Sequence, residues 1–526
     1  MQFETQATRF NRIQWAEALS PTLWSRIHWK WQHGIWLVAG LLCGASILAI
    51  LKFENEWRAF LLIGGIAPFV FMLSRSVKRL CLALLVLCVP INADVNLIYR
   101  PHHGGASGLG IHLIDIPLLC LCLFWLIEIA RNRRLGFSRL TPAIFPLFGF
   151  FVCALLSMLN AADVQFSLFE IVRLVEAMLI FFVIAHYVNE DREIRLILLL
   201  LVIGLLLESA MAFVQGYLGQ SLGLSLLGES EKIAEQELET VGSVTRVWGT
   251  FGSSNIFAFY LQCIVPVLIA LLFSRSVAPW KMLWLIVAIA GTIALLFTLS
   301  RGGWMGFACS MLIIAGFHFF RGRLTIAKVM ALVGVAGLAG LVLFGFSDLI
   351  CARLFSDDGE SAYLRVPMMQ VAWAIIKAHP ILGIGINNYT VVMRSYDSTA
   401  ERVSLWFDYP VHNEFLLLAA ETGIFGLLFF MAFMYFLFKI GLSAVKRHSK
   451  AQLTSHVAIG IMAGLFGFLV HCLGDFPLLG NFTLFWVLAG LLCASANRPA
   501  TRRVQLTENC FVKFITNVSL CSQHIK

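Results

Sequence analysis

Three residues, Arg301, Arg365 and His412, have the types and surroundings that could do chemistry in this chain. A guanidinium group presents a planar fork of N–H donors that matches the oxygens of a phosphate. A neutral imidazole can take a proton from a hydroxyl group, as a general base must. Together they predict a site that holds a diphosphate beside a histidine base.

Arg301 lies in the segment TLSRGGW, after a run of about twenty apolar residues and before two glycines. We expect it at the outer edge of a membrane span, where a positive charge is disfavoured unless something requires it. Its neighbour Ser300 adds a hydroxyl donor for the same anion. The alternative is an arginine that anchors the span to lipid headgroups.

Arg365 precedes an apolar, helix-like stretch, 366–378, with Pro367 in its first turn. This places Arg365 at a helix N-terminus, where the dipole and free N–H groups favour an anion. Arg353 is a further diphosphate-binding candidate of the same kind. The alternative for both is a surface arginine on a loop.

His412 follows Pro410 and is predicted to begin a membrane span. The positive end of the helix dipole and nearby arginines disfavour the imidazolium, so we expect a neutral ring that can act as a base. The alternative is that His412 only caps the helix, with Asn413 hydrogen-bonding locally.

Three more polar residues are possible supports for this site: Asn387, Asn413 and Asp475. The glycines at 383 and 385, with Asn387, allow a tight turn with exposed backbone amides. Asp475 is predicted on the outer side as a second polar contact. Glu421, close to two glycines, is predicted to serve helix packing.

The composition predicts an all-α, polytopic transmembrane helix bundle. Of 526 residues, 59% are hydrophobic and 13% are charged, far from the balance of a soluble domain. Because a span needs about 20 apolar residues, we expect about 12–14 spans. A partly helical periplasmic loop is predicted between the late spans.

The distribution of positive charge sets the topology. With the N-terminus inside, 27 Lys and Arg lie in inner segments and 11 in outer ones. This fits the positive-inside rule, with both termini in the cytoplasm. The net charge of +9 is thus a topology signal, and no nucleic acid partner is expected.

Two other clusters have plainer interpretations. Glu170, Arg173 and Glu176 share one helical face and predict an ion-paired stripe between helices, with a cavity-lining role as the alternative. His102 and His103 lie among Pro and Gly and predict an ordered loop that packs over the outer face. Because metal-ligand spacing is not evident there or among the thirteen cysteines, no metal site is expected.

Five regions follow from these patterns. They are a cytoplasmic N-terminal tail (1–34), an N-terminal transmembrane region (35–246), a core (247–440) with a periplasmic loop (347–411), C-terminal transmembrane helices (441–496) and a cytoplasmic tail (497–526).

Several motifs in order resemble the O-antigen ligase and O-antigen polymerase superfamily. They are Gly249–Asn255, Ser300–Gly303, the spaced pattern from Arg365 through Trp373 and Pro380 to Gly385, and His412–Leu428. The resemblance covers about residues 245–440. It implies a glycosyltransferase of the bacterial inner membrane with a periplasmic active site. Such enzymes move a glycan from an undecaprenyl-diphosphate carrier to an acceptor hydroxyl, without a metal or other cofactor.

Carried over by position, the resemblance makes Arg301 and Arg365 the diphosphate-contacting arginines and His412 the catalytic histidine. Direct attack without a protein nucleophile predicts inversion. The acceptor stays open between a glycan, a lipid A core and a protein. A lipid transporter or flippase, or a scaffold subunit of an envelope assembly complex, are the alternatives from other classes.

Overall fold

The computed structural model describes residues 76–91, 93–132, 141–224, 229, 240–241, 244–274, 280–320, 326, 361–447, 453–477, 480 and 482–496. The chain forms two compact units, Met1–Leu80 and Cys81–Lys526. Nearly all described residues belong to the second unit. Arg353 lies outside them, as do both predicted cytoplasmic tails.

The described part is dominated by helices, as predicted. They are α4 (Val77–Leu87), α5 (Asp115–Asn132), α6 (Thr141–Ser157), α7 (Val164–Tyr187), α8 (Asp191–Leu218), α10 (Ser254–Leu272), α11 (Lys281–Phe297), α12 (Arg301–Phe320), α15 (Ser361–Ala378), α16 (Tyr389–Tyr396), α17 (Glu414–Arg447), α18 (Leu453–His471) and α19 (Thr483–Ala496), with short 3-10 turns at Met158–Asn160 and Val403–Leu405.

Six of these helices are long and apolar enough to cross a membrane: α6, α8, α10, α12, α17 and α18. Two shorter apolar helices, α11 and α19, accompany them. The fold is therefore a polytopic helical membrane protein. The total of 12–14 spans includes segments outside the described residues and stays a prediction.

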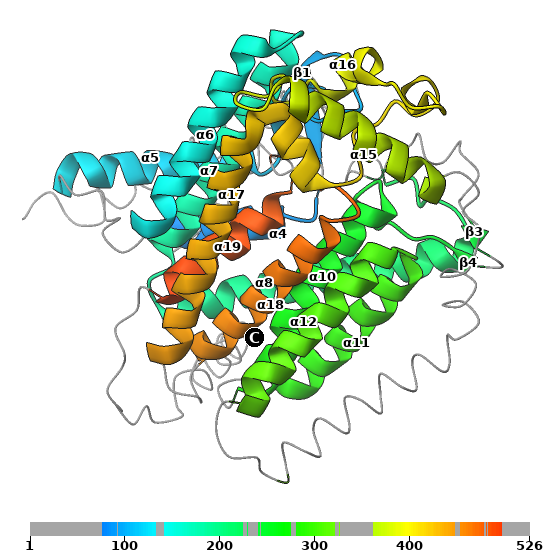
Figure 1. Cartoon of the computed structure of the whole chain (residues 1–526). Helices are drawn as coiled ribbons and strands as arrows, with labels where there is room; N and C mark the ends of the chain where they lie inside the picture. Colours follow the sequence, from blue (N-terminus) through cyan, green and yellow to red (C-terminus); the bar gives the residue numbers. More distant parts are fainter. Residues whose placement is uncertain are drawn as a thin grey trace, which may run out of the picture. The chain divides into compact units, whose positions relative to one another are not determined.

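The helices pack in pairs that are distant in sequence. α18 lies against α10 and α12, α17 against α6, and α19 against α7 (Figure 1). Where α12 meets α18, Gly306 and Gly467 bring the two backbones together, since a Cβ on either would overlap the other's carbonyl group. Small residues allow this close approach, which drives helix association in lipid.

Strands were not predicted, but two small sheets occur. β1 (Asp94–Tyr99) pairs antiparallel with β2 (Gly108–His112), with an irregularity between Asn96 and Ile98. β3 (Thr240–Val241) pairs with β4 (Val244–Thr245). The first hairpin carries the His102–His103 loop, which the sequence showed only as irregular chain.

The region from α15 to α17 differs in two details from what the sequence predicted. α15 begins at Ser361, so Arg365 lies inside its second turn and not at its N-terminus. The amides near Gly383 and Gly385 are not exposed: Ile384 N and Gly385 N donate to the carbonyls of Ala420 and Glu421 at 3.0 and 3.1 Å.

These two bonds exist because α17 is kinked at Gly423. Gly423 has φ 73° and ψ 175°, outside the helical region, so the preceding carbonyls lose their partners within the helix. The 381–385 turn supplies replacements, and Ile424 N donates to Pro380 O at 2.9 Å. The kink therefore holds the chain that follows α15 against α17.

We expect Gly423→Ala to destabilise the fold by roughly 1–3 kcal/mol, because a side chain disfavours this φ. Its Cβ would also overlap the backbone of Ile381. Thermal unfolding in detergent would measure the effect. Gly316→Ala is the matched control, since a Cβ there meets nothing within 4 Å. Equal melting temperatures for the two variants would contradict this role of Gly423.

Candidate active site

The turn between α18 and α19 is the centre of the candidate site. Asp475 in this turn is buried, and its Oδ1 lies 3.2 Å from Nδ1 of His412. The same oxygen accepts the Phe476 amide at 2.9 Å. The carboxylate can therefore accept the Nδ1–H proton of His412 and leave Nε2 as a proton acceptor.

Burial alone would raise the pKa of Asp475. The hydrogen bond from His412, the charges of His412 and His471, and the Phe476 amide together outweigh burial and hold this pKa below its ordinary value. Asp475 is therefore a carboxylate, the form that orients an imidazole and stabilises its cation.

The sequence predicted that His412 begins a helix. In the structure it precedes the first residue of α17 by two positions. Asn413 is the residue that caps it: its Oδ1 accepts Leu416 N, and its Nδ2 donates to Leu473 O, both at 3.0 Å. The side chain of His412 is 21% exposed. Because Asn413 supplies the cap, the His412 ring remains available for other partners.

Arg365 reaches the same turn from α15. A Cβ on Gly474 would lie 3.8 Å from its Nη1, and its charge acts on His471. Its Nε is buried and has no hydrogen-bond partner among the described residues. A buried N–H of a cation without an acceptor is costly, which suits a group that receives an anion.

Arg301 is the first residue of α12, and Ser300 caps this helix: its Oγ accepts Gly303 N at 3.3 Å. The helix N-terminus with a guanidinium, predicted for Arg365, is therefore found at Arg301. Before it, Leu299 has φ 53°, a strained value for a branched side chain. Such strain is often concentrated at functional sites.

His471 joins these residues and was not singled out from the sequence. It is the last residue of α18, is buried, and stacks on Phe259 with ring centroids 3.6 Å apart. Its Nε2 lies 3.2 Å from Ser300 Oγ. It lies four residues before Asp475, but the sequence alone does not distinguish it from a buried core histidine.

The structure thus brings five residues around one turn: Ser300, Arg365, His412, His471 and Asp475. Arg301 adjoins Ser300, and Asn413 caps α17 beside them. Asn387, the other predicted support, lies in a different set of contacts.

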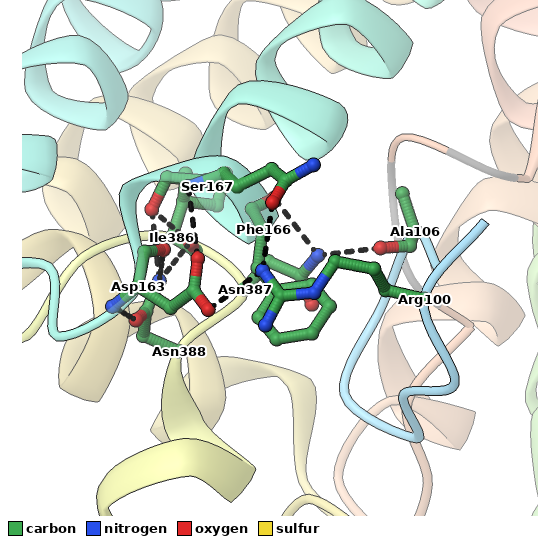
Figure 2. Close-up of polar contacts among 9 residues, drawn as sticks. Arg100, Ala106, Asp163, Phe166, Ser167, Ile386, Asn387 and Asn388 are labelled. Atoms are coloured by element: carbon green, nitrogen blue, oxygen red, sulfur yellow. Dashed lines mark hydrogen bonds and ion pairs between the residues drawn. The ribbon is translucent and has the colours of Figure 1, made fainter. Parts of the chain in front are cut away.

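Asn387 and Asn388 form what we call the asparagine clamp (Figure 2). Asn387 Nδ2 donates to Ala106 O and Phe166 O at 2.9 and 3.0 Å. Asn388 accepts Asp163 N at 2.7 Å and donates to Ser167 Oγ at 2.9 Å. The clamp ties the 385–388 turn to the start of α7 and to the β1–β2 loop.

His102 belongs to this clamp, as the predicted packing of its loop requires. Its Nε2 lies 2.8 Å from Asn387 Oδ1, and its ring stacks on Phe166 at 4.0 Å. Both Asn387 Nδ2 protons are used, so Oδ1 accepts and His102 carries its proton on Nε2. His103 contacts Tyr409 at 4.8 Å.

The predicted Glu170–Arg173–Glu176 stripe is ion-paired in part, because Arg173 pairs with Glu176 and Glu170 bonds to the β1–β2 loop. Arg173 Nη1 lies 2.7 Å from Glu176 Oε2, and Glu170 accepts Ala106 N at 2.9 Å. His112, Asp115 and Glu176 come close enough to hold a metal ion. Arg173 Nη1 also contacts His112 Nδ1, so a guanidinium already meets these ligand atoms and a cation would be repelled.

Residues 284–431 match the family model described as O-antigen ligase. The match runs from α11 into α17 and includes Arg301, Arg365 and His412. It confirms the resemblance to the O-antigen ligase and polymerase superfamily. No curated protein matches the chain.

The match and the apolar helices indicate a multi-pass bacterial membrane protein with a glycan-transfer role in O-antigen assembly. The activity is of the glycosyltransferase type, with lipid-linked glycan and acceptor partners. His471 and Asp475 lie beyond the matched segment, and the fold brings them to it.

Burial lowers the pKa of His102 below its ordinary value; the bonds to Asn387 oppose this shift. The neutral ring is favoured on folding, so its contribution to stability is complete above about pH 6.5 and is lost as the pH falls through the folded pKa. Between about pH 8 and about pH 5, we expect the melting temperature of wild type to fall further than that of His102→Gln, which keeps an N–H donor but does not titrate. Equal losses in the two proteins would contradict this assignment.

Proposed function

We propose that the chain transfers a glycan from an undecaprenyl-diphosphate carrier to an acceptor hydroxyl at the periplasmic face of the bacterial inner membrane. The observation that carries the proposal is the His412–Asp475 contact at 3.2 Å, beside Arg365 and Ser300. The region 247–440 is its proposed core, and the matched residues 284–431 lie inside it.

The orientation rests on charge. The excess of Lys and Arg in alternate loops favours cytoplasmic termini and an α15–α16 segment on the outer side. The site then faces the compartment where lipid-linked glycans are joined, with its arginines at headgroup level.

His412 acts as the base. Its Nε2 takes the proton of the acceptor hydroxyl as the acceptor oxygen bonds to the anomeric carbon. Asp475 holds the tautomer and stabilises the imidazolium that forms. A positioned base of this kind contributes about 10²–10⁴ in rate.

The arginines receive the leaving group. The bond between the anomeric carbon and the diphosphate oxygen breaks, and the electron pair leaves with the diphosphate. Arg365 offers its unpartnered Nε–H to this charge. Arg301 contributes its guanidinium at the N-terminus of α12, and Ser300 caps that helix by accepting Gly303 N. Arg353 is proposed as a further contact. Single displacement inverts the anomeric configuration and requires neither metal nor nucleotide sugar.

Reconstitution in liposomes with an undecaprenyl-diphosphate oligosaccharide tests the proposal. A glycan ladder with carrier alone would identify a polymerase, and one transfer to lipid A core a ligase. Transfer to a protein acceptor is the third possible product. Transport of the intact donor without a new glycosidic bond would contradict the proposal and favour a flippase.

We expect His412→Ala to insert and remain folded, with a lower melting temperature because the buried Asp475 loses its partner. We expect it to lose transfer by about 10²-fold or more, because the base is missing. His379→Ala is the matched control: this histidine also lies near α15 but bonds Tyr396 Oη at 2.7 Å. Product yield would be compared at equal amounts of folded, membrane-inserted protein and below the melting temperature of each variant. Wild-type yield from His412→Ala would remove the proposed mechanism.

We expect Arg365→Lys and Arg301→Lys each to reduce transfer by about 10²-fold, because a lysine keeps the charge and loses the planar fork. Arg447→Lys is the control, since Arg447 is the last residue of α17, at the opposite end of that helix from His412, and donates to Ala496 O at 2.9 Å. Initial rates at saturating donor would measure the effect. Mild loss in both site variants, equal to the control, would mean that these arginines only anchor lipid.

A further inference from the structure

A continuous row of ring contacts leads to His412 from the β1–β2 loop. The ring centroids of His103 and Tyr409 lie 4.8 Å apart, those of Tyr409 and Phe407 5.1 Å, and those of Phe407 and His412 5.7 Å. We call His103, Tyr409 and Phe407 the aromatic strip. It is built from two segments about 300 residues apart in sequence.

The strip is open to ligands at its far end. Tyr409 is 44% exposed, and His103 is also exposed, whereas Phe407 is half-buried against the hydrophobic cluster around α15. Asp408, between the two aromatic residues, has a side chain that is 54% exposed, and its Oδ1 lies 3.9 Å from Nη2 of the similarly exposed Arg394. The strip thus combines ring faces with a carboxylate that can accept hydrogen bonds.

The asparagine clamp holds the strip in place. Arg100 pairs with Asp163 at 2.8 Å and lies over the Phe166 ring at 4.4 Å (Figure 2). His102 stacks on the same Phe166 and bonds Asn387. The chain that leads into His103 is therefore held by these contacts, and the His103 ring lies against Tyr409. A pre-ordered surface binds at lower entropic cost.

We propose that the aromatic strip is a saccharide-binding subsite that holds the acceptor glycan; this rests on the proposed transfer function. The C–H groups on one face of a pyranose ring are weakly positive and apolar, and they complement the negative face of an aromatic ring. The equatorial hydroxyls then remain free for the Asp408 carboxylate and for water.

The order of contacts assigns the strip to the acceptor and not to the donor. Arg365, Ser300 and His471 reach His412 through Asp475, on its Nδ1 side. The strip reaches His412 through Phe407, by a different contact. His412 is thus the residue that contacts both sets, Asp475 through its Nδ1 and Phe407 through its ring. In the proposed complex, the sugar whose hydroxyl it deprotonates extends along Phe407 and Tyr409.

The test measures steady-state kinetics of the full-length protein in liposomes, with an undecaprenyl-diphosphate oligosaccharide as donor. Lipid A core is the acceptor probe, or a second carrier-linked repeat where wild type forms a ladder. Tyr409→Ala should raise the acceptor KM about five- to tenfold and leave kcat and the donor KM near wild type. Tyr409→Phe, which keeps the ring, should restore the acceptor KM.

Tyr217→Ala is the matched control: this tyrosine is 90% exposed near the end of α8, outside the strip, and its acceptor KM should equal that of wild type. An unchanged acceptor KM in Tyr409→Ala, beside an active wild type, overturns the strip alone. A raised donor KM with unchanged acceptor KM overturns its assignment to the acceptor. Wild type that forms no glycosidic bond overturns the proposed function itself.

Discussion

The contact between Asp475 and His412 is the interaction on which the site depends. A carboxylate at this place is buried, and burial disfavours its charge. It stays ionised because His412, just before α17, donates a hydrogen bond to it, and because the positive charges of His412 and His471 favour its charged form. The same contact fixes the imidazole tautomer. One interaction therefore stabilises the turn and orients the imidazole that we propose as the base.

Helix packing makes that contact possible. The α18–α19 turn follows a helix that is packed backbone to backbone against α12, where Gly306 and Gly467 meet. α12 begins at Arg301, so the same contact surface sets the distance between Ser300 and His471. The α17 kink at Gly423 fixes the chain after α15 in a similar way. Close packing of small residues in the apolar part thus positions charged groups at its edge.

The sequence predicted the helical class, the helical segment between the late spans and the resemblance to the O-antigen ligase family. Apolar runs and charge alternation are local signals, and they are strong in membrane proteins. The predicted start of α15 was wrong because this helix contains Pro367 in its interior, although a proline usually marks the first turn of a helix. The prediction of exposed amides near Gly383 was wrong because these amides donate to carbonyls of α17, and the local sequence cannot show such distant partners.

His471 and the asparagine clamp were missed for a related reason. A buried histidine at a helix end has no pattern that distinguishes it from core, and its partner Ser300 is 171 residues away. Asn387 was expected near the base, since both lie in one polar segment, but the clamp takes all its side-chain hydrogen bonds. Predicting a site from spacing works along one helix face and fails where pairing is set by the tertiary fold.

The clamp and the site nevertheless act on one segment. The chain from Asn387 to His412 is held at its start by the clamp and at its end by Asp475. Between these points it carries α16, Phe407 and Tyr409. A segment fixed at both ends loses little entropy when a ligand binds to its middle. The two sets of buried polar contacts, one around asparagines and one around a carboxylate, therefore hold the surface between them, where we propose that the acceptor sugar binds beside His412.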